Sequence, residues 1–223
     1  MRAAIVLFAR SPEREAAAKR MPSSAPLFRS LAAAWLREAM RCGAAPVIAC
    51  SARDREAFAA IAPDVPRAWI EQRGGAFGDR VAAVAEEAFA RGLDAVIVAA
   101  IDAPPRELDR ALRALSRGVA VVSPSRDGGI NYIGLLAPER ELLRRLAPRR
   151  RDLVRVCAGY FARLEVVGGA VDLDSRDGLA VVGRDRAWRA YVGVPLTLAL
   201  SPRGGERGLI GFSFPHRSRP PPL

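Results

Sequence analysis

The side chains available for chemistry in this chain are carboxylates, guanidinium groups and one ammonium group. Lys19 is the only lysine, and the only histidine, His216, falls in the C-terminal segment 194–223. We therefore expect neither Ser-His-Asp or Cys-His catalysis nor imidazole metal ligands in the body of the chain. Carboxylate oxygens are preferred ligands of Mg²⁺ and Mn²⁺, and the planar guanidinium group of arginine can donate two parallel hydrogen bonds to a phosphate. The residue set favours chemistry on a phosphorylated substrate with a divalent cation.

Asp102 is the leading single candidate, because it directly follows the apolar segment Ala95 to Ile101 (AVIVAAI). This segment is typical of a buried strand, and open α/β sheets bind ligands at the carboxyl ends of their strands. A carboxylate there could hold a divalent ion against a diphosphate. Alternatively, Asp102 could cap a helix that begins at Pro104 and Pro105, since Asp is a favoured N-cap residue.

Two further acidic segments follow later strands. The sequence Asp127-Gly-Gly comes after the strand-like segment 119–123 and predicts a hairpin turn, because Asp-Gly is a strong turn signal. In the functional interpretation, Asp127 faces the same cleft as Asp102. Asp172 and Asp174 follow a late strand, and their spacing places both carboxylates on one side of an extended segment. Solvated acids or a helix cap are the alternative for this pair.

The elements that would position these residues alternate along the chain. Short apolar segments and helical patterns follow one another, which predicts an α/β fold with a mainly parallel, Rossmann-like sheet and helices on both faces. The predicted strands are 3–9, 46–50, 68–71, 95–100, 119–123, 132–136 and 164–167. The predicted helices are 26–43, 54–61, 81–92, 104–115, two within 138–158, and 176–191. Polar loops at 10–24, 72–80, 102–105 and 123–129 follow strands, where ligands bind.

Composition excludes several classes of protein. The formal net charge is +11, but the basic clusters carry no interleaved aromatic residues, which argues against nucleic-acid binding. The three cysteines form no CxxC pair, so we expect reduced thiols and no zinc site. The longest apolar runs have seven residues against the roughly 20 of a membrane span, and no signal peptide is evident. We expect a cytoplasmic protein.

The C-terminal segment 194–223 differs from the rest of the chain. It is rich in proline and arginine and has no apolar periodicity, which predicts a disordered tail after a single domain over 1–193. Its stretch PLTLALSPRGGERG resembles the in-frame translation of a bacterial intergenic repeat.

The motifs, in their order, resemble the bacterial arsenosugar-biosynthesis-type glycosyltransferase family. The matching segments run from residue 3 to residue 179 and are IVLFARSP, QRGGAFGDR, VIVAAIDAPP, SPSRDGGINYIG and VDLDSRDGL. The resemblance implies a GT-A-like, nucleotide-diphosphosugar transferase fold. In the first loop this chain departs from the family, because Glu15 stands where the family has a glycine and Ala18 stands at the first basic position.

Carried over by position, the resemblance implies a set of site residues. Metal would bind at Asp102 and Asp174, while Asp102 and Asp127 would be catalytic. Nucleotide would bind at Lys19, Arg20, Gly75, Gly78, Arg80, Gly128 and Gly129.

The expected activity is that of a Mg²⁺- or Mn²⁺-dependent glycosyltransferase. It would take a nucleotide-sugar donor and a small-molecule acceptor that the sequence does not identify. The alternatives are a nucleotidyltransferase on the same fold, or a catalytically degenerate nucleotide-binding or scaffold protein.

Overall fold

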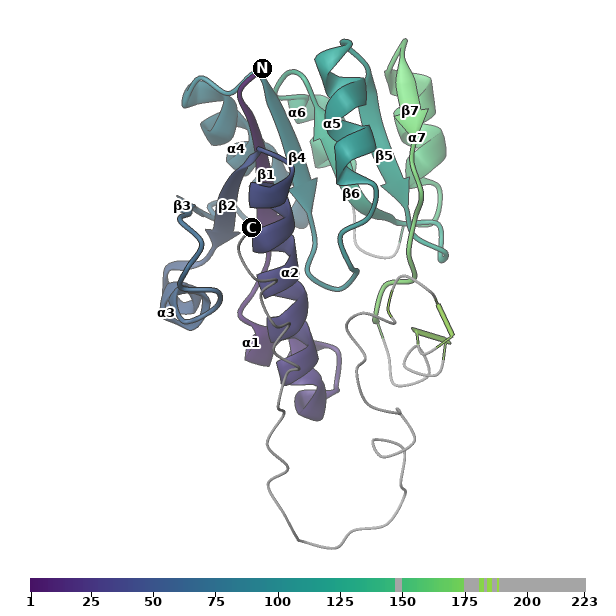
Figure 1. The fold of residues 1–223 in the computed structure, drawn as a ribbon. Helices are drawn as coiled ribbons and strands as arrows, with labels where there is room; N and C mark the ends of the chain where they lie inside the picture. The colour runs from purple at the N-terminus through teal and green to yellow at the C-terminus, as the bar shows by residue number, and fades with distance from the viewer. Residues whose placement is uncertain (147–149, 175–180, 183, 186–187, 189–223) are drawn as a thin grey trace, which may run out of the picture.

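The computed structural model describes residues 1–146, 150–174, 181–182, 184–185 and 188. Seven strands form one mixed sheet in the order β3-β2-β1-β4-β6-β5-β7, shown in Figure 1. The strands are β1 (Ala3–Phe8), β2 (Ala45–Cys50), β3 (Ala68–Glu71), β4 (Ala95–Ala99), β5 (Ala120–Pro124), β6 (Ile130–Leu135) and β7 (Leu164–Val166). All seven predicted strands are confirmed.

One strand runs against the others. β6 is antiparallel to both of its neighbours, β4 and β5, whereas every other pairing is parallel. The carboxyl ends of β1, β2, β3, β4, β5 and β7 therefore meet at one edge of the sheet. We call this the carboxyl edge, and the predicted mainly parallel α/β class is confirmed.

Helices cover both faces of the sheet, because the central strands are apolar on both sides. In β1, Ile5 and Leu7 pack toward one core, and Ala4 and Val6 pack toward the other. Helices α2 (Ala25–Arg41) and α5 (Leu108–Ser116) bury their apolar stripes in the first core. Helices α4 (Phe77–Ala90), α6 (Arg140–Arg144) and α7 (Leu153–Tyr160) do so in the second (Figure 1).

Two short helices complete the order of elements. Helix α1 (Pro12–Ala18) follows β1, and α3 (Arg55–Ala59) follows β2, with 3-10 turns at Pro22–Ser24 and Ala52–Asp54. No helix in the described part of the chain is long and apolar enough to cross a membrane. All three cysteines carry free thiols.

Two predicted segments fold differently from the expectation. The stretch 10–24 was predicted as a loop, but it contains α1, because Pro12 occupies the first helical turn and the following Glu, Arg and Ala residues are strong helix formers. Helix α5 begins at Leu108 rather than at Pro104, and its N-cap Glu107 has a left-handed φ of 50°. The predicted helix 176–191 and the tail 194–223 lie almost wholly outside the described residues.

Candidate functional site

The polar loops predicted to bind a ligand lie at the carboxyl edge. They follow β1, β3, β4 and β5, and α1 lies beyond this edge in Figure 1. Asp102 follows β4, and the segment 171–174 follows β7. The architecture therefore brings residues that are far apart in the sequence to the same side of the sheet.

A backbone hydrogen bond joins the two acidic segments directly. The amide of Leu173 donates to the carbonyl oxygen of Asp102 at 2.8 Å. Asp172 and Asp174 flank Leu173, and one carboxylate oxygen from each of Asp102, Asp172 and Asp174 lies within 4.8 Å of the others. We call these three residues the acidic cluster. The predicted placement of the 172/174 pair on one side of an extended segment matches this arrangement.

Buried aromatic side chains fix both halves of the cluster. The indole Nε1 of Trp35 in α2 donates to the carbonyl of Ala103 at 2.8 Å, next to Asp102. The indole Nε1 of Trp188 donates to the carbonyl of Val171 at 2.8 Å. Both indoles are almost fully buried. Because each holds a backbone group one residue from a cluster aspartate, the carboxylates are preorganised.

Two side chains, Ser125 just after β5 and Asn131 in β6, form hydrogen bonds with the segment 170–174. The Ser125 hydroxyl donates to the Asp172 carboxylate. Asn131 is 3% exposed, and its Nδ2 donates to the carbonyls of Pro124 and Ala170 at 3.0 and 3.1 Å. Its Oδ1 has no hydrogen-bond partner among the described residues.

Lys19 is the cation of the cluster. Its Nζ donates to Asp102 Oδ2 at 2.7 Å and also to Asp174 Oδ1, and Glu15 lies 3.8 Å away. The Lys19 side chain is only 10% exposed. Burial lowers the pKa of Lys19, but the charge of Asp102 and the hydrogen bonds to both aspartates outweigh it, so the pKa is raised above its ordinary value. Lys19 is therefore charged at neutral pH.

One ammonium does not balance the negative charge of the cluster. The pKa of Asp172 is raised to about 7, first by burial and then by the charges of neighbouring carboxylates, which belong to Asp102, Asp127 and Asp174. Burial, followed by the charge of Asp102, also raises the pKa of Glu15. Burial and the neighbouring negative charges therefore both favour the neutral forms of Asp172 and Glu15.

The cluster has the chemistry of a divalent-cation site. Its three candidate ligand atoms are carboxylate oxygens, which Mg²⁺ and Mn²⁺ prefer, and they lie close enough together to share one ion. The Lys19 ammonium, which donates to Asp102 and Asp174, already places one positive charge against these carboxylates. The donor set thus fits the metal that the sequence predicts.

The capping alternative for Asp102 does not hold. Helix α5 begins at Leu108 with Glu107 as its N-cap, so Asp102 lies well before the helix. The carboxylate of Asp102 instead accepts the hydrogen bond from Lys19. A role within the acidic cluster is therefore the interpretation that the local structure supports.

The Asp-Gly-Gly hairpin forms between β5 and β6 as predicted. Asp127 Oδ1 accepts a hydrogen bond from the amide of Gly129 at 2.9 Å, which closes the turn. Gly128 has a φ of +93°, and a Cβ there would collide with the carbonyl of Arg151. The left-handed φ and the close approach of Arg151 explain Gly128, and nucleotide binding by Gly128 and Gly129 stays a prediction. Asp127 lies near enough to Asp172 to raise its pKa.

The polar loop predicted at 72–80 carries Gly75, Gly78 and Arg80, and its two glycines lie in different surroundings. Gly75 is exposed, and a Cβ there would meet nothing within 4 Å. Gly78 is buried in α4, where a Cβ would lie 2.6 Å from the carbonyl oxygen of Arg144, the last residue of α6. Arg80 Nε is buried and has no hydrogen-bond partner within the described residues. Helix packing therefore explains Gly78, whereas nucleotide binding by Gly75 and Arg80 stays a prediction.

Some members of the site were not predicted as such. Asp172 was expected to pair with Asp174 but was not assigned to the metal, and Ser125 was not singled out. The DxD spacing was the available signal for Asp172, whereas the only signal for Ser125 was its place in the polar loop 123–129. Arg20, predicted to bind nucleotide beside Lys19, is exposed and has a left-handed φ of 57°.

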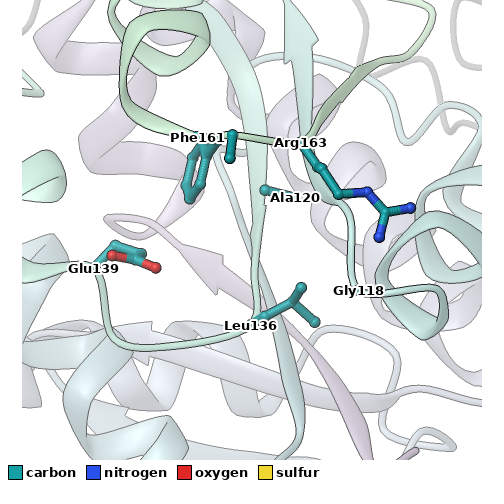
Figure 2. A pocket seen from close by; sticks show the side chains of 7 residues that line it. Gly118, Ala120, Leu136, Glu139, Phe161 and Arg163 are labelled. Carbon is teal, nitrogen blue, oxygen red and sulfur yellow. The ribbon is translucent and has the colours of Figure 1, made fainter.

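A separate hollow, whose lining side chains are drawn in Figure 2, lies at the opposite edge of the sheet, where β5 and β7 begin. Its volume is about 200 Å³, and its lining includes Ala120 at the start of β5, Leu136 after β6 and Phe161 before β7. None of the predicted site residues lines it. The hollow is thus distinct from the acidic cluster.

Solved structures share this fold. One is a protein from Desulfovibrio desulfuricans that is provisionally named a nucleotide-diphospho-sugar transferase. Its sequence is 21% identical to this chain, and the two structures superpose with a TM-score of 0.68. The match covers 86% of this chain and 95% of the Desulfovibrio protein. The 4-diphosphocytidyl-2C-methyl-D-erythritol synthase of Anaerococcus prevotii is 10% identical with a TM-score of 0.53, covering 86% of this chain and 99% of its own.

A cytidylyltransferase from Leptospira borgpetersenii is 12% identical with a TM-score of 0.53, covering 86% of this chain and 92% of its own. At these identities the likenesses establish the GT-A-like fold that nucleotide-diphospho-sugar transferases and nucleotidyltransferases share.

Sequence comparison gives the family. A search of curated proteins finds no match. The model of a family described as uncharacterized proteins conserved in bacteria (DUF2064) matches residues 35–147, just over half of the chain. The matched region includes Asp102 and the Asp127 hairpin, while Lys19, Asp172 and Asp174 lie outside it. The chain therefore belongs to the DUF2064 family of bacterial proteins.

Proposed function

We propose that this protein is a metal-dependent glycosyltransferase that takes its sugar from a nucleotide-activated donor. The observation that carries the proposal is the acidic cluster, in which Asp102, Asp172 and Asp174 converge within 4.8 Å at the carboxyl edge. These three carboxylates would hold a divalent cation, which would supply positive charge to a leaving diphosphate. The position suits this role because open α/β sheets bind ligands outside the carboxyl ends of their strands.

The other residues of the edge have complementary roles in this proposal. Lys19 and Arg20 neutralise phosphate oxygens, and the Gly75 loop with Arg80 contacts the nucleotide. Asp127 orients the acceptor and takes its proton as the new bond to the sugar's anomeric carbon forms and the bond to diphosphate breaks. The geometry that supports Asp127 is its place in the β5–β6 turn, close enough to act on Asp172.

The resemblance to the arsenosugar-biosynthesis-type glycosyltransferase family supports glycosyl transfer. So does the name of the similar Desulfovibrio desulfuricans protein, a nucleotide-diphospho-sugar transferase. The resemblance extends over residues 3–179, including the segment around Asp172 and Asp174.

Nucleotidyl transfer is the second candidate. Two of the similar structures are a cytidylyltransferase and a 4-diphosphocytidyl-2C-methyl-D-erythritol synthase. In such a reaction a nucleophile attacks the α-phosphate of a nucleoside triphosphate and pyrophosphate leaves. The same acidic cluster and Lys19 would serve, because both reactions place a phosphate chain at the carboxyl edge.

One screen separates these functions. The melting temperature of the full chain is measured with each nucleoside diphosphate, nucleoside triphosphate and common nucleotide sugar, with and without Mn²⁺. We expect a Mn²⁺-dependent rise with a nucleotide sugar, followed by release of nucleoside diphosphate in the presence of acceptors. Pyrophosphate release from a nucleoside triphosphate would instead establish nucleotidyl transfer. The absence of any nucleotide-induced shift would contradict both and favour a non-catalytic scaffold.

A further inference from the structure

The acidic cluster already contains a cation that belongs to the chain. The Lys19 ammonium donates to one oxygen of Asp102 and one oxygen of Asp174, and its side chain is 10% exposed. These two aspartates are also two of the three residues that converge as candidate metal ligands. A divalent cation and the ammonium would therefore carry like charges into the same small space.

We propose that Lys19 is a resident counter-ion that the metal must displace, and that the freed ammonium passes to the diphosphate of the donor. This inference rests on the proposed function. Metal alone has to break two charge-assisted hydrogen bonds of Lys19 without replacing them. Metal with a diphosphate offers the ammonium a new anionic partner, so the two ligands favour one another's binding.

The surroundings of Lys19 allow its side chain to move while its backbone stays in place. Helix α1 is anchored by Arg14, whose guanidinium donates to the buried carboxylate of Asp54 at 2.5 Å. Met21, two residues after Lys19, is 1% exposed in the core. Because the chain on both sides of Lys19 is fixed, only its flexible stem has to swing between the cluster and a phosphate.

Glu15 strengthens the hold of the cluster on Lys19. It lies one helical turn before Lys19, 3.8 Å from the ammonium, and Arg10 lies 3.7 Å from Glu15 on its other side. This carboxylate stands where the resembled family has a glycine. It therefore adds a third acid around the ammonium, beside Asp102 and Asp174, in the free protein.

Titration of Mn²⁺ alone tests the inference, with bound metal measured as loss of the free Mn²⁺ signal in electron paramagnetic resonance. Lys19→Met removes the ammonium and keeps the length of the stem. We expect Lys19→Met to bind Mn²⁺ alone at least tenfold more tightly than wild type, since nothing competes for the carboxylates. Arg20→Met is the matched control, because it removes an adjacent positive charge whose side chain makes no hydrogen bond or ion pair with the acidic cluster. Its affinity for Mn²⁺ should stay close to that of wild type.

A second measurement keeps the test decisive. Lys19→Gln removes the charge with a polar side chain, and it replaces Lys19→Met if that variant does not give a cooperative thermal transition. An equal or weaker Mn²⁺ affinity in the folded Lys19 variant overturns the inference, and so does an equal gain in Arg20→Met. If wild type shows a Mn²⁺-dependent nucleotide shift while the Lys19 variant shows no gain, this inference fails and the proposed function stands. Absence of that nucleotide shift in wild type overturns the proposed function instead.

Discussion

Asp172 is the residue at which the folded site bears an electrostatic cost. Its pKa is raised from 3.8 to about 7, by burial and by its neighbouring carboxylates. The folded protein therefore holds this proton more tightly than the unfolded chain does. As a result, the cost to folding is absent below about pH 4, grows as the pH rises, and is complete above pH 7.

Asp172→Asn should remove this cost, since the amide oxygen can still accept the Ser125 hydrogen bond. Without added metal, we expect the variant to melt at least about 2–4 °C above wild type at pH 8, the change that 1 kcal/mol produces in a chain of this size. The difference should vanish near pH 4. Melting curves across pH 4–8 check this, and a difference that does not change with pH would contradict it.

The sequence identified most of the residues that meet at the site. Asp102 was predicted from its place after the most apolar strand, which is a property of local sequence. Ser125 could not be predicted, because its role depends on a contact with Asp172 across two strands. The hydrogen bond from Trp35 to the carbonyl of Ala103 could not be predicted from the sequence either, since helical periodicity indicates only that Trp35 is buried.

At the scale of elements, Gly78 is the residue at which α4 packs closely against α6. A Cβ at this position would lie 2.6 Å from the carbonyl oxygen of Arg144 and 2.7 Å from that of Leu143, and backbone cannot move aside as a side chain can. Gly78→Ala should therefore force α4 and α6 apart and cost about 1–3 kcal/mol of the free energy of unfolding.

Gly75→Ala, just before α4, is the matched control, because a Cβ at this position would meet nothing within 4 Å. We expect its free energy of unfolding to stay within about 0.5 kcal/mol of wild type. Denaturant titration measures both variants. Equal stability of Gly78→Ala and Gly75→Ala would show that the packing of α4 on α6 does not require the glycine.

Element boundaries were predicted less well than element types. Helix α1 was missed because only Pro12 and Ala16 are buried, so the segment has no apolar stripe to reveal a helix. The predicted start of α5 at Pro104 was too early, because prolines at 104 and 105 are compatible with a first helical turn. The chain instead stays irregular as far as Glu107, whose carboxylate accepts a hydrogen bond from the amide of Gly168 at 2.9 Å. Such a tertiary contact is not encoded in the local pattern.

At the scale of the whole molecule, the core reaches past β7 to Trp188. This side chain is fully buried and holds the carbonyl of Val171, one residue before Asp172. A chain that ends at residue 193 should keep the wild-type melting temperature and nucleotide binding, because the segment 194–223 has no apolar stripe to dock.

A chain that ends at residue 187 is the control, since it lacks Trp188. Loss of a buried tryptophan typically costs about 3–5 kcal/mol, so this shorter chain should melt well below the first. Differential scanning calorimetry compares the two. A large loss of stability on removing only residues 194–223 would contradict the predicted domain boundary.

The central claim is that Asp102 helps to hold a divalent cation to which a nucleotide diphosphate binds. Asp102→Asn keeps the size of the side chain and removes its charge, and the absence of a capping role means that the fold should tolerate it. The decisive measurement is calorimetric titration of wild type and Asp102→Asn with a nucleoside diphosphate at saturating Mn²⁺. We predict an affinity at least tenfold lower in the variant, about 1.4 kcal/mol, at an almost unchanged melting temperature. Unaltered Mn²⁺-dependent binding in a well-folded Asp102→Asn protein would contradict the claim.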